Sequence, residues 1–444
     1  MKFVIEKISK SSGRLGYLVQ TETEKRFRTP LLVQTTKGGS IPYLSREVFD
    51  YVTEEVPALQ FTLSTIDHMV ESLKLFNGTF GAYVGYPECL SFLIIRDSCE
   101  LIPSGHNDKD IIPLFTRRGK EHITVKRYMD TVETLKPDIY QGLCDADTNL
   151  ESSKKRIIKC VDRTAQFMDA CYERHQNSKV LKKCALFAPI VGGYSTHARC
   201  ESIKHAKAKG EKLANGYIFE GFHNYGLSAC QVDSEQLIKV MTHCLNELSD
   251  DKPKMMPGAY TPPVMLELIS LGVDIFDTSY AYCAASNFKA LTFNFNLKTV
   301  ENATSQPFLE ISNERYLNIY VNMLNLSNKY LFQINSLKED FTPLIRDCSC
   351  LTCRKHTRAY LNHLYKTKEL LGPILLMIHN LHHMMHFFST ICKCIADDNL
   401  PDLIKLIKFQ RGSLAVDYSI KPNTKIISKN DQDKNYTILN DDQK

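Results

Sequence analysis

The middle of the chain repeats one pattern, in which a short continuous run of apolar residues is followed by a helical segment. Apolar side chains on both faces of such a run are typical of a strand in a parallel sheet that is covered by helices. The runs predict strands at Ala185 to Val191, Gly216 to Phe222, Met255 to Tyr260 and Val273 to Thr278. The sequence therefore predicts an α/β fold built from βα units.

The same pattern extends on both sides of these strands. Helices are expected at His122 to Leu135, Ser152 to Arg174, His197 to Ala214 and Pro262 to Gly272, with a further strand at Asp138 to Leu143. About 300 residues of such units suit a (β/α)8 TIM barrel. A doubly wound sheet is the alternative, but no Gly-x-Gly-x-x-Gly follows any of these strands.

The two ends of the chain differ from this pattern. The first 40 residues look like a hairpin with turns at Gly13 to Gly16 and Glu22 to Lys25, which would cap the barrel mouth. From about Asp417 onward polar residues dominate and apolar periodicity disappears. We therefore expect one domain over residues 1–415, including a helical module at about 340–395, and a polar, disordered tail over residues 416–444.

Composition narrows the cellular setting. The 444 residues carry a formal charge of +5, which is compatible with a polyanionic partner but small for this length. No signal-peptide pattern follows Met1, so the 15 cysteines are expected to be reduced. The most apolar span, Leu370 to Phe388, contains Asn380 and four histidines and is expected to be a buried helix. We expect a cytoplasmic protein.

One group of cysteines is clustered. Cys348, Cys350 and Cys353 place three thiols within six residues, directly before a helix expected to start near His356. Thiolates at this spacing converge on one metal ion, and structural zinc sites use four ligands that are rich in sulfur. The cluster predicts one structural Zn²⁺ per chain, although buried thiols without a metal are the alternative.

The fourth zinc ligand is expected on the next helix. Gly372-Pro373 should break the intervening helix, so that the following one folds back beside the thiols. Its histidines are His379, His382, His383 and His386, which share one helix face. The spacing alone leaves the choice among them open.

A longer set of motifs carries a resemblance to a known family. Cys348-x-Cys350-x-x-Cys353, followed by Leu361-Asn362-His363-Leu364 and His379-Asn380-Leu381, resembles the zinc module of the tRNA-guanine transglycosylases. Thr29-Pro30, Gly192-Gly193 and Gly272 to Asp277 extend the resemblance over nearly the whole chain. In that family the histidine before Asn-Leu is the fourth ligand, which selects His379.

The resemblance is closer to one branch of the family. Tyr140 to Asp147 and Val161 to Thr164 are similar to its non-catalytic eukaryotic members. This implies a subunit that forms a heterodimer with a catalytic queuine tRNA-ribosyltransferase subunit, through surfaces around Cys348 to His386. The complex would exchange guanine for queuine at the wobble position of GUN-anticodon tRNAs, in queuosine biosynthesis. The resemblance also implies peripheral association with the mitochondrial outer membrane.

The family's chemistry can be compared residue by residue. Asp277 occupies the nucleophile position of the resemblance, but the Thr-Asp-Ser-Gly-Gly-Phe-Gln run that supplies the acid/base aspartate is absent between Phe61 and Asp97. Glu220 replaces a glycine of the base-recognition stretch, and the family's arginine after the nucleophile is missing from Thr278 to Cys283. We therefore expect no catalytic residue, with Asp277 as a vestigial position that caps nearby amides. The alternatives are an active transglycosylase with a rearranged site that uses Asp277, and an unrelated barrel hydrolase.

Basic residues suggest where RNA could lie. Arg354, Lys355 and Arg358 surround the expected zinc helix and are candidates for phosphate contact. A second group, from Lys204 to Lys212, is expected to face outward from a barrel helix. Solvated charged faces are the alternative for both groups.

Overall fold

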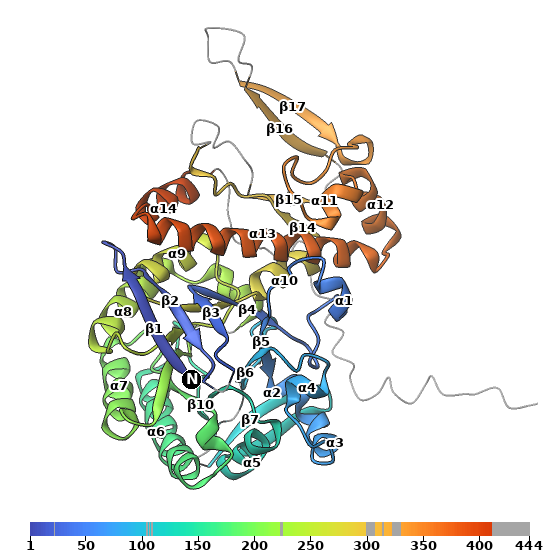
Figure 1. Cartoon of the computed structure of the whole chain (residues 1–444). Helices are drawn as coiled ribbons and strands as arrows, with labels where there is room; N and C mark the ends of the chain where they lie inside the picture. Colours follow the sequence, from blue (N-terminus) through green and yellow to red (C-terminus); the bar gives the residue numbers. More distant parts are fainter. Residues whose placement is uncertain are drawn as a thin grey trace, which may run out of the picture.

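A closed barrel of eight parallel strands forms the centre of the computed structural model (Figure 1). The structure describes residues 1–410 except 22, 104, 106, 108–109, 223–224, 299–306, 313–314 and 322–329. In barrel order the strands are β10 (Ala185–Ile190), β11 (Ala214–Phe219), β12 (Lys254–Met255), β13 (Ile275–Asp277), β4 (Leu31–Thr35), β5 (Ala58–Thr62), β6 (Leu90–Ile94) and β9 (Ile139–Gln141). The predicted (β/α)8 barrel is confirmed.

Helices surround the barrel on its outside, as Figure 1 shows. They are α1 (Arg46–Phe49), α2 (Leu63–Ile66), α3 (Val70–Leu73), α4 (Phe80–Tyr83), α5 (Val125–Leu135), α6 (Lys154–Asn177), α7 (Thr196–Gly210), α8 (Ser234–Glu247), α9 (Pro262–Ser270) and α10 (Ser279–Ser286). The helix expected from His122 begins only at Val125, because Thr124 caps it and accepts a hydrogen bond from the backbone N–H of Arg127 over 3.2 Å. Residues 122–124 instead end the antiparallel hairpin of β7 (Ile111–Thr116) and β8 (Gly119–Thr124).

The N-terminal residues form three antiparallel strands, one more than the expected hairpin: β1 (Lys2–Ile8), β2 (Arg14–Val19) and β3 (Arg26–Thr29). Leu18 and Phe27 of this sheet pack against residues that open the barrel strands, such as Ala58 and Leu90. The sheet therefore covers the end at which the strands begin, whereas Asp277 closes β13 at the opposite, C-terminal end.

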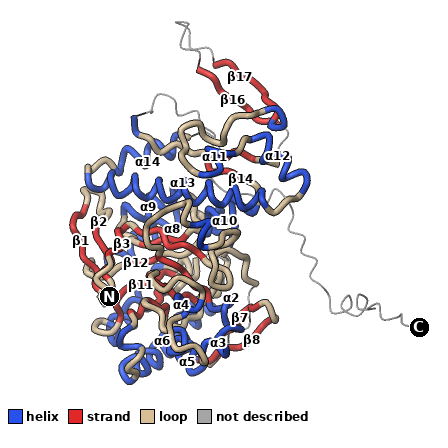
Figure 2. The backbone as a smooth tube through the Cα atoms, turned by 45° about the vertical axis from the view of Figure 1, so that its right-hand side comes forward, coloured by secondary structure: helices blue, strands red, loops and turns tan. Residues whose placement is uncertain are grey.

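A helical module follows the barrel, and its longest helix runs beside the barrel in both views (Figures 1 and 2). Its elements are β14 (Lys289–Leu291), β15 (Phe308–Glu310), β16 (Arg315–Val321), β17 (Tyr330–Ser336), α11 (Leu351–Lys355), α12 (Arg358–Thr367), α13 (Leu371–Ala396) and α14 (Leu400–Phe409). The break expected at Gly372-Pro373 falls at Lys368, in the left-handed conformation, and Pro373 lies in the first turn of α13. Helix α13 packs against α10, β14 and α14.

Two expectations concern the outer limits of the chain. Among the described helices, α13 included, none has the length and apolarity to cross a membrane. The tail expected at residues 416–444 lies outside the described residues, so the domain boundary at residue 415 stays a prediction.

Candidate metal centre and barrel site

The three clustered thiols and one histidine converge in the helical module. Nδ1 of His379 lies 3.8 Å from Sγ of Cys348, 3.5 Å from that of Cys350 and 3.4 Å from that of Cys353. All four ligand atoms lie within 4.8 Å of one another. Zinc at about 2.3 Å from sulfur and about 2.0 Å from nitrogen separates neighbouring donors of a tetrahedron by roughly 3.5 Å. The group could therefore hold one tetrahedral metal ion.

Local structure orients the donors toward this point. Cys350 precedes α11 as its N-cap, and its sulfur accepts a hydrogen bond from the backbone N–H of Cys353 over 3.3 Å. Nε2 of His379 lies 2.9 Å from the carbonyl oxygen of Leu291. This contact assigns the proton to Nε2 and leaves Nδ1 to face the thiols, as in many metal-bound histidines.

The other three histidines do not meet all the thiols. His382 contacts only the sulfur of Cys348, at 3.7 Å, and turns its other nitrogen toward the hydroxyl of Ser349. His383 packs between the rings of Phe293 and Phe295. His386 stacks on His382. The geometry thus favours His379, a choice that spacing alone left open.

Charge supports a cation at this point. Contacts with Cys348 and Cys353 raise the pKa of the Cys350 thiol well above its ordinary value. Burial lowers the pKa of His379, but its contacts with Cys348 and Cys353 outweigh burial and raise that pKa to about 10. The crowded thiols cannot all ionise without a positive charge between them, and a divalent ion removes this conflict.

Asp277 is fully buried at the C-terminal end of the barrel. Its Oδ1 accepts hydrogen bonds from the backbone N–H and the hydroxyl of Ser279. Its Oδ2 accepts from the amide of Gln60 at 3.2 Å and from the backbone N–H of Gly258 at 3.0 Å. The carboxylate caps amides, and neither oxygen faces solvent.

Sequence reasoning missed Asp97, which lies three positions after Ile94, the last residue of β6. Its Oδ1 accepts a hydrogen bond from the backbone N–H of Cys99 at 2.8 Å, and Oδ2 lies 3.5 Å from Nζ of Lys37. Burial raises the pKa of this carboxyl, and Lys37 opposes the effect. Its place shortly after an apolar run is the sequence signal that identifies it, because the unbroken family motif is absent from this stretch.

Lys37 and two tyrosines form a contact group beside Asp97. The ammonium of Lys37 lies 4.6 Å from the centroid of the Tyr282 ring and also pairs with Glu100. Tyr43 stacks on Tyr282 with a centroid distance of 5.8 Å. Because Lys37 also pairs with Asp97, this group ties three segments together over the C-terminal end of the barrel.

Glu220 fills the position where the family resemblance places a glycine. Its carboxylate accepts hydrogen bonds from the hydroxyl of Tyr225 and from the amide of Gln141 at 3.0 Å. Burial raises its pKa, and nearby Arg96 opposes this. Arg96 itself donates to the carbonyl oxygen of Cys144 at 3.1 Å. These side chains are all buried. His223 and Asn224 of this stretch lie outside the described residues.

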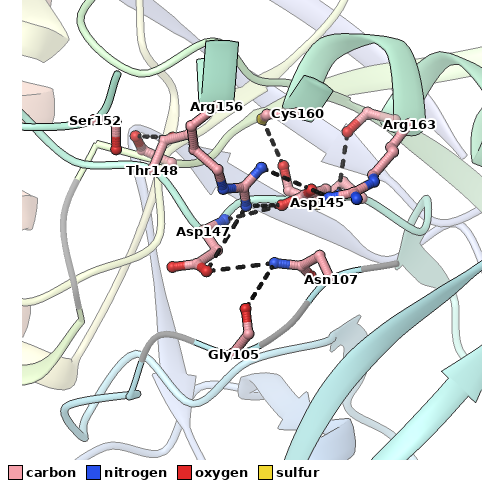
Figure 3. A network of polar contacts seen from close by, with 12 residues as sticks. Gly105, Asn107, Asp145, Asp147, Thr148, Ser152, Arg156, Cys160 and Arg163 are labelled. Carbon is pink, nitrogen blue, oxygen red and sulfur yellow. Dashed lines mark hydrogen bonds and ion pairs between the residues drawn. The ribbon is translucent and has the colours of Figure 1, made fainter. Parts of the chain in front are cut away.

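A neighbouring network fixes the segment after β9 (Figure 3). Buried Asp145 accepts hydrogen bonds from Arg156 at 2.9 Å and from Arg163 at 3.1 Å. Asn107 donates to Asp147 at 3.3 Å. Two arginines on one buried carboxylate make this a structural anchor.

The basic residues near the metal group have different environments. Arg354 and Lys355 are exposed. Arg358 is held in place, because its guanidinium pairs with Asp340 at 3.1 Å and donates to the carbonyl oxygens of Pro343 and Leu344. The second basic group is partly neutralised, with ion pairs from Lys204 to Glu201 and from Lys209 to Asp169.

The chain is thus a (β/α)8 barrel protein with a helical module whose Cys3His group could hold a metal ion. Buried carboxylates lie at the C-terminal end of the barrel, where such barrels hold their active sites. The family model described as Queuine tRNA-ribosyltransferase matches residues 9–412, and the chain belongs to that family.

Relatives extend the match over almost the whole chain. The protein named Queuine tRNA-ribosyltransferase accessory subunit 2 from Drosophila virilis is 54% identical over 430 residues, which cover 97% of each chain. Proteins of the same name from Drosophila yakuba and Drosophila melanogaster are 55% and 54% identical over 434 residues, again covering 97% of each chain.

Proposed function

We propose that this chain is the non-catalytic accessory subunit of a heterodimeric queuine tRNA-ribosyltransferase. Its catalytic partner would exchange guanine for queuine at the wobble position of GUN-anticodon tRNAs. The similarity to named accessory subunits over 97% of the chain supports this role. The observation that carries it is Asp277, whose two carboxylate oxygens are buried and committed to four hydrogen bonds.

The rest of the barrel end supports the same conclusion. A glycosyl transfer needs an accessible nucleophile and a second group that moves the proton. Asp97, another carboxylate at this end, is buried and paired with Lys37. An active enzyme that used Asp277 would have to break its four hydrogen bonds.

The metal group fits one structural Zn²⁺ held by Cys348, Cys350, Cys353 and His379. Three sulfurs and one nitrogen within reach of a tetrahedral ion match the donor preference of zinc. Bound zinc would supply cross-linking of the helical module and no reaction chemistry, because four protein ligands leave no open position. The contact of His379 with Leu291 would extend that cross-link to β14.

The partner surface is expected around residues 348–386, on the helical module. On α12, Tyr360 is 38% exposed and stacks between His356 at 5.4 Å and His363 at 6.4 Å. Aromatic side chains that are rigid and exposed are enriched in protein interfaces. This stack is the centre of the proposed interface with the catalytic subunit.

RNA contact and location complete the proposal. Arg354 and Lys355 are exposed beside the metal group and are the candidates for phosphate contact, while Arg358 supports the fold. We place the complex in the cytoplasm, with peripheral attachment to the mitochondrial outer membrane.

Mixing the chain with its catalytic homologue tests this proposal. Light scattering should give a one-to-one complex, and base exchange should exceed that of either chain alone. A Tyr360→Asp variant should weaken the complex, whereas Tyr51→Asp, at another exposed tyrosine, should leave it intact. Two chains that stay separate at micromolar concentration, with full exchange by the homologue alone, would contradict the accessory role.

A further inference from the structure

The β7–β8 hairpin presents a rigid tip at the C-terminal end of the barrel. It lies between β6 and α5, and its strands pair without interruption from Ile111 and Thr124 to Thr116 and Gly119. The base is anchored in the core, because Ile112, Leu114 and Ile123 are at most 1% exposed. The hairpin therefore holds its tip in one place relative to the barrel.

Three cations form this tip, namely Arg117, Arg118 and Lys120, and all three are exposed. The hydroxyl of Thr116 accepts a hydrogen bond from the backbone N–H of Arg118 at 3.2 Å and donates to the carbonyl oxygen of Gly119 at 3.1 Å. Gly119 has a φ of +114°, a conformation that glycine adopts without strain. The turn is thus fixed by its own hydrogen bonds, with its cations in solvent.

The tip carries a local excess of positive charge. Residues 116–127 contain five lysines and arginines but one acidic residue. Nearby Arg127 pairs with Glu121 and Asp67, and Lys126 pairs with Asp130. Within the part of the chain that the structure describes, no carboxylate forms an ion pair with the three tip residues.

The hairpin also borders the site described above. Its residues Pro113 and Phe115 line a small cavity of about 20 Å³ together with Arg96 and Tyr225. Arg96 precedes Asp97 in the chain, and the hydroxyl of Tyr225 donates to Glu220. The hairpin therefore lies beside the buried carboxylates at the C-terminal end of the barrel. Macromolecular substrates of such barrels approach this end.

We propose that Arg117, Arg118 and Lys120 contact the sugar-phosphate backbone of the tRNA. Three exposed cations without carboxylate partners, on a fixed support, suit a polyanion that is bound through charge and not through its base sequence. This inference rests on the proposed function and adds a binding surface to it. Lys204 and Lys209 lack this property, because Glu201 and Asp169 neutralise them.

Titration of the assembled heterodimer with a GUN-anticodon tRNA, at several salt concentrations, tests the contact. Changing Arg117, Arg118 and Lys120 together to Gln should weaken binding about tenfold at ~0.1 M salt. It should also reduce the slope of log Kd against log salt by about 2 to 3, since each phosphate contact contributes roughly 0.9. The charge-preserving Arg117→Lys, Arg118→Lys, Lys120→Arg variant and the control Lys204→Gln, Lys209→Gln should both bind as the wild type does.

Two results would overturn the contact. One is an unchanged Kd and salt slope in the glutamine variant. The other is dissociation of the heterodimer, which would make the hairpin a protein interface. Light scattering and base exchange are measured in parallel. If the wild-type chains form no complex and show no gain in exchange, the proposed function is contradicted. If complex and exchange persist in the glutamine variant and its tRNA binding is unchanged, only the hairpin contact is contradicted.

Discussion

The amide nitrogen of Gln60 lies 3.2 Å from Oδ2 of Asp277 and thereby joins strands β5 and β13 across β4. The same nitrogen lies 3.1 Å from the hydroxyl of Ser98. Asp277 thus braces the interior of the barrel at its C-terminal end. A carboxylate in this role contributes to stability, because its removal would leave buried donors without acceptors.

The first prediction concerns the metal group. Purified protein should contain about one zinc ion per chain, and Cys350→Ser should lose the ion together with several kcal/mol of unfolding free energy, because metal binding contributes directly to folding. Metal analysis and urea unfolding measure both effects. Cys200→Ser is the matched control, because this thiol contacts His243 away from the metal group. A full complement of zinc in the Cys350→Ser variant would rule out the assigned ligand set.

The second prediction concerns the junction between the helical module and the barrel. Oδ1 of Asn380 accepts a hydrogen bond from the backbone N–H of Leu291, and its Nδ2 donates to the carbonyl oxygens of Lys289 and Ala281. Asn380→Ala should lower the free energy of unfolding by about 2 to 4 kcal/mol, because it leaves these buried groups unpaired. Thr390→Ala on the same helix, where the hydroxyl bonds to the carbonyl of His386, should cost under about 0.5 kcal/mol. Equal losses of unfolding free energy in the two variants would contradict a special role of Asn380 at this junction.

The third prediction concerns pH. His175 is buried, and its Nδ1 lies 2.7 Å from the hydroxyl of Tyr140. Burial, assisted by Lys182, lowers its pKa in the folded state, so the unfolded chain takes up a proton more readily. The contribution of His175 is therefore present above about pH 6.5 and is lost as the pH falls below it.

Urea unfolding between about pH 7 and pH 5 measures this contribution. The wild type should lose stability more steeply than His175→Phe, by up to about 1.4 kcal/mol per pH unit. The comparison removes the pH dependence of the metal ligands, which both proteins share. Parallel stability curves would show that His175 does not titrate differently in the two states.

Local patterns predicted much of this molecule. Continuous apolar runs such as Ala185 to Ile190 fix strand positions because both faces are buried, and the clustered thiols are neighbours in sequence. The contacts between distant segments at the C-terminal end of the barrel could not be predicted from the sequence. Lys37 meets Asp97 and Tyr282 across 60 and 245 positions of the chain, and no local pattern encodes such pairings.

The sequence also did not predict the ends of the strands or, from spacing alone, which histidine is the fourth metal ligand. The strand expected from Met255 to Tyr260 ends at Met255 in the structure, where pairing with β13 is confined to Met255 and Ile275. Four histidines share a face of α13, and only the three-dimensional position of the thiols favours His379. The resemblance had selected the same residue without a geometric reason.

The central claim is that this chain contributes no catalytic group, and base exchange by the assembled heterodimer tests it most directly. Asp277→Asn, which keeps the size of the side chain, and Asp277→Ala should each leave the exchange rate of the purified one-to-one complex within about twofold of the wild type. Removal of the nucleophile in the catalytic partner should abolish exchange in the same assay. Loss of exchange in both Asp277 variants, with light scattering showing an intact complex, would contradict the account.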